Sequence, residues 1–183
     1  MGSRSGYPPR AMKKHRIALI STGGTVEKTY NELEGVLHNV YSVLDVMLAS
    51  LLLEGVEIVR VPLMSKDSLD MNATDHALIA ETAGAMCHAH DGVVIVHGTD
   101  RLALTGERMV EVHGTPSVPI VLTGAIRPYM LRNSDAEQNL TEALLAVQVL
   151  EPGVYCVMHN KVLRFPGVIK DHDRSTFRYA AQP

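Results

Sequence analysis

Three short polar stretches carry the residue types that could do chemistry in this sequence. Residues 21–25 read Ser-Thr-Gly-Gly-Thr, residues 97–100 read His-Gly-Thr-Asp, and residues 123–128 read Thr-Gly-Ala-Ile-Arg-Pro. Each stretch combines glycine with a hydroxyl or carboxylate side chain. Glycine lets backbone N–H groups approach a ligand closely, and such groups hold oxyanions and carboxylates. The three stretches therefore indicate oxyanion or carboxylate binding.

Each stretch taken alone also has a purely structural interpretation. A Gly-Gly turn after a strand is usually a tight connection, and a Thr-Asp pair before a helix usually caps it. The first glycines match neither GxGxxG nor GxxxxGK[ST], and the sequence contains no GxSxG. It therefore lacks the signatures of nucleotide binding and of a serine nucleophile elbow.

The elements that must position these stretches alternate along the chain. Short apolar runs, rich in β-branched residues, occur at 17–20, 56–61, 92–96, 118–122 and 154–158. Unbroken runs of this kind are typical of strands buried on both faces. Helices are predicted between these runs. Three of them extend from Asn39 to Leu53, from Asn72 or Thr74 to Ala89, and from Thr99 or Asp100 to Val112. A fourth is predicted over 134–150, where Ser134 and Glu137 form a capping box at its start. Strands alternating with helices predict a parallel sheet.

The parallel sheet gives the three stretches a common place. Ligands bind open α/β sheets beyond the carboxyl ends of the strands. All three polar stretches directly follow predicted strands, at 17–20, 92–96 and 118–122. We therefore expect them to lie together at one edge of the sheet.

Composition narrows the class of protein. The 183 residues are 46% hydrophobic and 20% charged, with a formal net charge of −3. This balance is typical of one globular domain and argues against nucleic acid or an anionic membrane as a partner. No apolar stretch approaches the roughly 20 residues of a membrane span. Cys87 and Cys156 are far apart and no histidine has metal-ligand spacing, so we expect no disulfide, no metal and a cytoplasmic location.

Two signatures resemble those of the bacterial-type L-asparaginase/glutaminase family. Residues 22–25, Thr-Gly-Gly-Thr, and residues 97–100 are similar to its paired signatures, and 121–128 and 162–171 resemble two further segments. The resemblance extends from about Arg16 to Phe177. It implies a three-layer (αβα) Rossmann-like α/β domain with flavodoxin-like topology, and hydrolysis of L-asparagine without a cofactor. We expect a flexible leader at 1–15 and this domain at 16–183, without the family's C-terminal domain.

The resemblance also assigns catalytic roles. Thr25 corresponds to the nucleophilic threonine, and Thr99, Asp100 and Lys170 correspond to the second threonine, the aspartate and the lysine of the family. The roles are chemically reasonable because a threonine hydroxyl is a weak nucleophile and needs a positioned base. A buried lysine beside a hydroxyl can relay that proton. Tyr30 corresponds to the tyrosine on a mobile lid.

The resemblance further implies a set of substrate-binding positions, which includes two of the catalytic residues. The expected substrate-binding residues are Gly24, Ser68, Leu69, Gly98, Thr99, Asp100 and Ala125. Asp100 is expected to bind the α-ammonium group, and the backbone at Ala125 to border the leaving amide. The family has glutamine after the serine that corresponds to Ser68. Leu69 takes that place here, which weakens the expected carboxylate contact and favours low glutaminase activity.

The absence of a second domain would leave the site open, so we expect a homo-oligomer, a dimer or a tetramer. Two other functions stay open beside the amidohydrolase: a non-catalytic amino-acid-binding or regulatory domain, and an amidotransferase-associated subunit. A pure binding domain has no need of Thr25 together with Lys170, and both are present.

Overall fold

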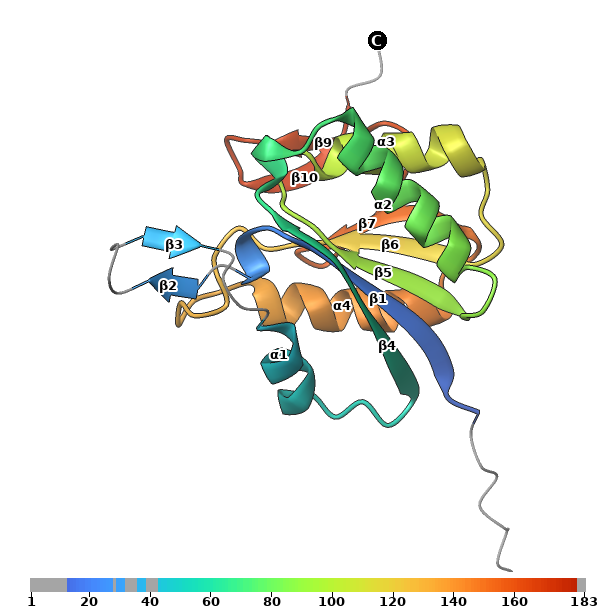
Figure 1. Cartoon of the computed structure of the whole chain (residues 1–183), viewed down its shortest axis with the longest axis horizontal. Coiled ribbons are helices and arrows are strands. Elements are labelled where there is room, and N and C mark those ends of the chain that lie inside the picture. Colours follow the sequence, from blue (N-terminus) through green and yellow to red (C-terminus); the bar gives the residue numbers. More distant parts are fainter. Residues whose placement is uncertain (1–12, 28, 32–35, 39–42, 181–183) are drawn as a thin grey trace, which may run out of the picture.

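The five apolar runs form the parallel strands of one central sheet (Figure 1). The computed structural model describes residues 13–27, 29–31, 36–38 and 43–180. The parallel strands are β1 (His15–Gly23), β4 (Val56–Lys66), β5 (Gly92–Val96), β6 (Pro119–Thr123) and β7 (Gly153–Met158). They lie in the order β4-β1-β5-β6-β7, and β8 (Lys161–Arg164) pairs antiparallel with β7. Counted along the chain, the parallel strands run 2-1-3-4-5, which confirms the flavodoxin-like topology.

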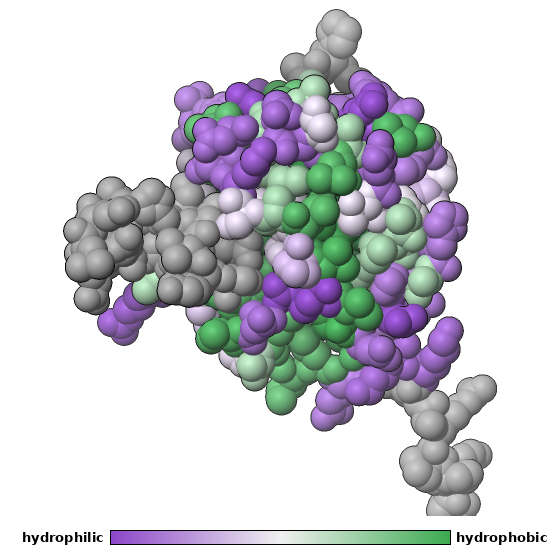
Figure 2. All heavy atoms as spheres, viewed as in Figure 1, coloured by the Kyte–Doolittle hydropathy of each residue, from purple (hydrophilic) through white to green (hydrophobic). Residues whose placement is uncertain are grey.

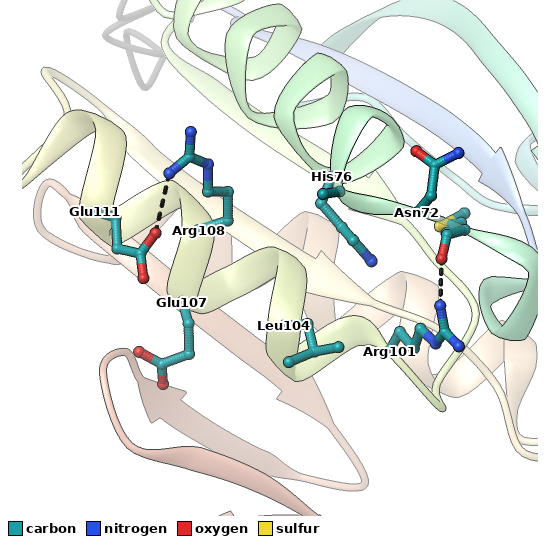
Figure 3. Close-up of a pocket in the computed structure, with 9 residues that line it drawn as sticks. Asn72, His76, Arg101, Leu104, Glu107, Arg108 and Glu111 are labelled. Carbon is teal, nitrogen blue, oxygen red and sulfur yellow. Dashed lines mark hydrogen bonds and ion pairs between the residues drawn. The ribbon is translucent and has the colours of Figure 1, made fainter.

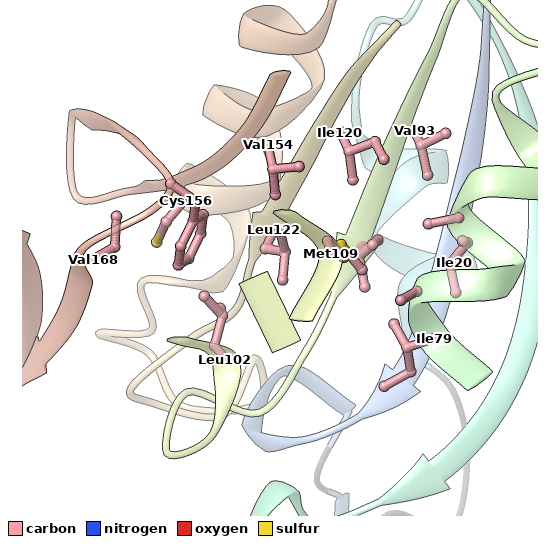
Figure 4. Close-up of a cluster of buried hydrophobic side chains, with 14 of the residues drawn as sticks. Ile20, Ile79, Val93, Leu102, Met109, Ile120, Leu122, Val154, Cys156 and Val168 are labelled. Carbon is pink, nitrogen blue, oxygen red and sulfur yellow. The ribbon is translucent and has the colours of Figure 1, made fainter. Parts of the chain in front are cut away.

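Helices cover both faces of the sheet, which makes the predicted three layers (Figure 1). Helices α2 (Ala73–Met86) and α3 (Leu102–His113) pack on one face, and α1 (Leu44–Ser50) and α4 (Ala136–Val149) pack on the other. Successive side chains of a strand point to opposite faces. Ile20 accordingly lies in the cluster beneath α2 and α3, which Figure 4 shows with Ile79 and Met109, while Leu19 lies in the cluster beneath α1 and α4.

The helix starts show where local sequence rules hold and where they fail. Of the two caps predicted for α2, Asn72 and Thr74, Asn72 is the N-cap, and it forms a reciprocal capping box with Asp75. Helix α3 instead begins after Arg101, without a side-chain cap, so the predicted cap by Thr99 or Asp100 is wrong. The capping box of Ser134 with Glu137 is also wrong, because Asp135 is the N-cap of α4.

Several predicted boundaries also differ from the structure. Helix α2 ends at Met86 and α1 begins at Leu44, whereas Asn39 lies outside the described residues. Residues 1–12 of the predicted leader also lie outside them, and His15 already belongs to β1.

Short strands outside the main sheet carry two residues of the predicted site. Strand β2 (Thr29–Asn31) pairs with β3 (Val36–His38), and β9 (Val168–Asp171) pairs with β10 (Thr176–Tyr179). Strands β8 to β10 were not predicted, because their short, partly exposed segments lack a continuous apolar run. Tyr30 lies on β2 and Lys170 lies on β9.

The β4 edge of the sheet is only half covered. Most side chains of β4 are half-buried, and Figure 2 shows apolar residues over the part of this face formed by β4 and α1. Nearby, Val46 and Leu52 are exposed.

Among the described residues, no helix is both long and apolar enough to cross a membrane.

Candidate active site

The first two polar stretches meet through direct contact of their glycine backbones. A Cβ atom on Gly24 would lie 2.5 Å from both the Cα and the N atom of Gly98. Gly24 also has a φ angle of +83°, which residues with a side chain rarely adopt. Only glycine fits at this position. Because Thr25 and Thr99 each follow one of these glycines, the contact brings both threonines to the same edge of the sheet.

The remaining stretches join through two more glycine contacts. A Cβ atom on Gly98 would lie 2.6 Å from the Oγ atom of Ser68, which begins the 3-10 helix η2 (Ser68–Asp70) after β4. A Cβ atom on Gly124 would overlap the carbonyl oxygen of His97. The loops after β1, β4, β5 and β6 therefore pack closely against one another at these glycines.

Lys170 links the second stretch to the far end of the chain. Its Nζ atom donates a hydrogen bond of 2.8 Å to Thr99 Oγ1 and one of 2.7 Å to Asp100 Oδ1. The lysine side chain is only 12% exposed, whereas that of Asp100 is 37% exposed. Thr99 itself is buried. This geometry places a shielded ammonium group between a hydroxyl and a carboxylate that remains accessible to a ligand.

Thr25 is half-buried and begins the 3-10 helix η1 (Thr25–Glu27) directly after Gly24. The loop before it is held by Thr22, whose Oγ1 atom donates a hydrogen bond of 3.0 Å to the carbonyl oxygen of Val96. Strand β2 follows, so Tyr30 lies five residues beyond Thr25 on the next hairpin. The side chain of Tyr30 lies outside the described part of the structure.

The other predicted binding residues differ in exposure. Ser68 is 1% exposed, and its Oγ atom has no hydrogen-bond partner among the described residues. Such an orphaned buried hydroxyl is rare, and a ligand that accepts or donates a hydrogen bond would explain it. Leu69 is 58% exposed beside it, and Ala125 is fully buried in the loop after β6. The structure thus brings together the loops that carry Gly24, Ser68, Gly98 and Ala125.

A known protein family matches most of the chain. Residues 16–181 match the family described as Asparaginase, N-terminal, and this range contains every residue of the site. The chain belongs to the asparaginase family.

Two relatives and one solved structure are similar to this asparaginase-family chain. The L-asparaginase of Thermococcus kodakarensis is 31% identical over 159 residues, covering 86% of this chain and 48% of the relative. A glutamyl-tRNA(Gln) amidotransferase subunit from Methanobrevibacter smithii is 33% identical over 151 residues, covering 81% of this chain and 34% of the relative. The solved structure of the thermostable L-asparaginase from Thermococcus kodakarensis gives a TM-score of 0.82 at 28% identity, covering 92% of this chain and 52% of that one. This chain therefore spans about half the length of the L-asparaginase and a third of the length of the amidotransferase relative.

A partly buried carboxylate that the sequence did not single out anchors the loop after β6. Asp135 accepts hydrogen bonds from the backbone N–H groups of Ile126 and Arg127 at 2.9 to 3.1 Å, and His159 Nε2 lies 2.7 Å from its Oδ2 atom. Asn139 donates to both Asp135 and the Gly124 carbonyl oxygen, each at 2.9 Å. Desolvation raises the pKa of Asp135, but the hydrogen bonds together outweigh it and leave the pKa below its ordinary value.

Two further polar residues without a predicted role lie in the core beneath α2 and α3. Thr105 is 0% exposed and His76 is 8% exposed, and both belong to otherwise apolar helix faces. Thr105 contacts the ring of His97, which lies directly before Gly98. One feature of the sequence could have identified them: polar residues at positions of a helical pattern that face the core indicate a buried hydrogen-bond network.

A hollow lies beside the candidate site, in a groove between α2 and α3 (Figure 3). Its volume is about 610 Å³, and its lining includes His76, Arg101 and Leu104. Neither Thr25 nor Lys170 contributes to it. Among the described residues, no group of three or more His, Cys, Asp or Glu side chains could hold a metal ion.

Proposed function

We propose that this asparaginase-family chain hydrolyses the side-chain amide of L-asparagine, with Thr25 as the nucleophile. The observation that carries the proposal is the position of Lys170 Nζ, within hydrogen-bond distance of both Thr99 and Asp100. A binding domain needs no lysine shielded in this way beside a second hydroxyl. Similarity to an L-asparaginase over most of the chain supports the same reaction.

The reaction proceeds in two acyl-transfer steps. The Thr25 hydroxyl oxygen attacks the amide carbon, its proton passes by way of Thr99 and Lys170 to the amide nitrogen, and ammonia leaves. Water then attacks the resulting ester, which releases aspartate and restores the Thr25 hydroxyl. No oxidant, reductant or cofactor enters the balance.

The proposed binding mode uses the groups that remain open at the site. The accessible carboxylate of Asp100 binds the substrate α-ammonium group, and the orphaned hydroxyl of Ser68 binds its carboxylate. The backbone N–H of Thr99 donates a hydrogen bond to the developing oxyanion, and the Ala125 backbone borders the departing amide. Leu69 supplies no hydrogen-bond donor, so we expect weak substrate affinity and low glutaminase activity.

The similarity to an amidotransferase subunit favours one alternative function. In that case the same acyl-transfer chemistry would deliver ammonia to a partner protein instead of to water. An amidotransferase-associated chain is expected to release little ammonia when it is alone. Steady turnover by the isolated chain would therefore favour the hydrolase. The expected homo-oligomer, as a dimer or tetramer, stays a prediction.

The test is ammonia release from L-asparagine and from L-glutamine, with substrate raised to tens of millimolar, roughly, to allow for weak affinity. Thr25→Ala should abolish release and retain the native circular dichroism spectrum. Thr141→Ala, the same change at an exposed position of α4, should retain full activity. Unchanged turnover in Thr25→Ala would exclude the assigned nucleophile, and absence of release by the unmodified chain would favour the binding or amidotransferase alternatives.

A further inference from the structure

Four groups form a buried chain of hydrogen bonds that leads from helix α2 to the candidate site. His76 Nδ1 lies 2.7 Å from Thr105 Oγ1, and Thr105 Oγ1 lies 2.8 Å from His97 Nε2. The other ring nitrogen of His97, Nδ1, lies 2.7 Å from the carbonyl oxygen of Gly98. His97 and Thr105 are fully buried. The chain therefore connects α2, α3 and the loop after β5 without solvent between its members.

The chemistry of the groups fixes the direction of every hydrogen bond. A carbonyl oxygen only accepts, so His97 Nδ1 carries a proton and donates to Gly98. Burial lowers the pKa of His97 to about 4, so near neutral pH the ring is uncharged and its Nε2 atom is an acceptor. Thr105 must then donate its single proton to His97 Nε2. The other possible acceptor of this proton, the Arg101 carbonyl oxygen, lies farther away, at 3.5 Å. The Thr105 oxygen can then accept a hydrogen bond from His76 Nδ1.

The last hydrogen bond of the chain orients a peptide group of the candidate site. In a trans peptide, the C=O of one residue and the N–H of the next point in opposite directions. Because His97 holds the Gly98 carbonyl, the Thr99 N–H points away from His97. Among the described residues, none accepts a hydrogen bond from that N–H. Gly98 also packs closely against Gly24 and Ser68, which restricts the movement of this peptide.

We propose that His76 and Thr105 are positioning residues, which fix the tautomer of His97 and thereby aim the Thr99 N–H at the developing oxyanion. The inference rests on the proposed amide hydrolysis. The proposed binding mode gives neither residue a contact with the substrate. His76 is the outer end of this arrangement, because its ring reaches the groove between α2 and α3 (Figure 3). Its ring also lies nearly parallel to that of His97, with centroids 6.2 Å apart.

The test removes the central hydroxyl with little change of shape. Thr105→Val should lower kcat for asparagine about 10- to 100-fold, below the full loss of an oxyanion donor, with a much smaller change in KM. Thr105→Ser retains the hydroxyl and should recover most of kcat. His76→Phe retains a ring but removes the donor to Thr105, and should lower kcat less than Thr105→Val. Thr141→Val, at an exposed position of α4, is the matched control and should have wild-type kinetics.

A spectroscopic measurement tests the arrangement independently of turnover. Long-range 1H–15N NMR of the unmodified chain should show His97 protonated on Nδ1 and bare on Nε2. Thr105→Val should shift the Nε2 resonance, because that nitrogen loses its donor. His97 protonated on Nε2 in the unmodified chain would overturn the proposed direction of the hydrogen bonds.

The outcomes separate this inference from the proposed function. If the unmodified chain releases ammonia and Thr105→Val and His76→Phe retain its kcat, the positioning role is wrong and the hydrolase assignment stands. If the unmodified chain releases none, the hydrolase assignment fails, and with it the catalytic role of the two residues, while the NMR result still decides the tautomer. Should Thr105→Val not fold, His76→Phe and Thr105→Ser decide the kinetic question.

Discussion

At the scale of single residues, the site depends on groups whose hydrogen-bonding capacity is incompletely used inside the protein. Lys170 donates two of its three N–H groups, to Thr99 and Asp100. Ser68 has a buried hydroxyl without any partner among the described residues. Buried polar groups are normally satisfied, so both residues lie in an environment suited to a polar ligand.

Replacing Lys170 with methionine tests the proton relay. We expect Lys170→Met to lower kcat about 10²- to 10⁴-fold, because Thr99 and Asp100 lose the group that moves the proton. The fold should persist, since Asp100 is 37% exposed and water can hydrate its carboxylate. Steady-state ammonia release and circular dichroism measure the two effects. Lys13→Met changes a lysine whose side chain is 89% exposed, and an equal loss in that control would contradict a specific role for Lys170.

Removing the orphaned hydroxyl should affect binding and not stability. We expect Ser68→Ala to raise KM for asparagine about tenfold, the usual effect of losing one hydrogen bond to a charged group. Because the hydroxyl has no partner among the described residues, its removal should leave the free energy of unfolding unchanged or increase it. Urea unfolding and initial rates provide the two values. A lower stability with an unchanged KM would show that Ser68 is structural.

At the scale of elements, the loops after β1 and β5 meet backbone to backbone, so their glycines decide whether the site forms. Gly24 has both a left-handed φ angle and the Gly98 backbone 2.5 Å from its missing Cβ atom. Gly167 shares the conformation, with φ of +93°, but a Cβ atom there would meet nothing within 4 Å. Comparing variants at Gly24 and Gly167 therefore distinguishes the cost of backbone strain from the cost of disturbing the contact between the loops.

We expect Gly167→Ala to cost only the left-handed strain, about 1–2 kcal/mol of unfolding free energy, with turnover retained. Gly24→Ala should cost more and also abolish turnover, because the β1 loop must move away from Gly98 and carry Thr25 with it. Chemical unfolding and ammonia release on both variants measure this difference. Equal stability and equal turnover in the two variants would mean that the loop contact is unimportant.

At the scale of the whole molecule, Asp135 connects three segments through hydrogen bonds. Its partners lie in the loop after β6, in helix α4 (Asn139) and in the turn after β7 (His159). The ordinary pKa of an aspartate is about 3.9, and Asp135 in the folded protein titrates below its ordinary value. Its ionised form is therefore favoured by folding. The resulting stability is fully present above pH 4, roughly, and is lost as the pH falls toward the folded pKa.

We expect Asp135→Asn to lower the free energy of unfolding by about 1–3 kcal/mol at pH 7, and the difference from wild type to shrink as the pH falls below roughly 4. Urea unfolding between pH 2.5 and 7, as an approximate range around the aspartate pKa, measures both effects. Asp173→Asn, at an exposed position between β9 and β10, is the control and should follow the wild-type curve. A constant difference at every pH would show that the ionisation of Asp135 does not contribute.

The sequence alone determined the alternation of strands and helices and the edge of the sheet at which the polar stretches lie. Continuous apolar runs such as 92–96 are local signals, and parallel strands bring the stretches that follow them to one edge. The glycines of residues 21–25 and 97–100 were recognised for the same reason, because close backbone approach is a property of the residue itself.

Which side chains meet depends on the packing of elements that lie far apart in the sequence. Thr99 and Lys170 are separated by 71 residues, and their contact requires the β9–β10 hairpin, which has no strong local pattern. His76 and Thr105 come from different helices and meet because α2 packs beside α3. Thr99 and Asp100 resemble a helix cap, yet they bind Lys170 instead. Local patterns specify elements, whereas contacts between elements depend on how the layers pack, and no short stretch of sequence contains that information.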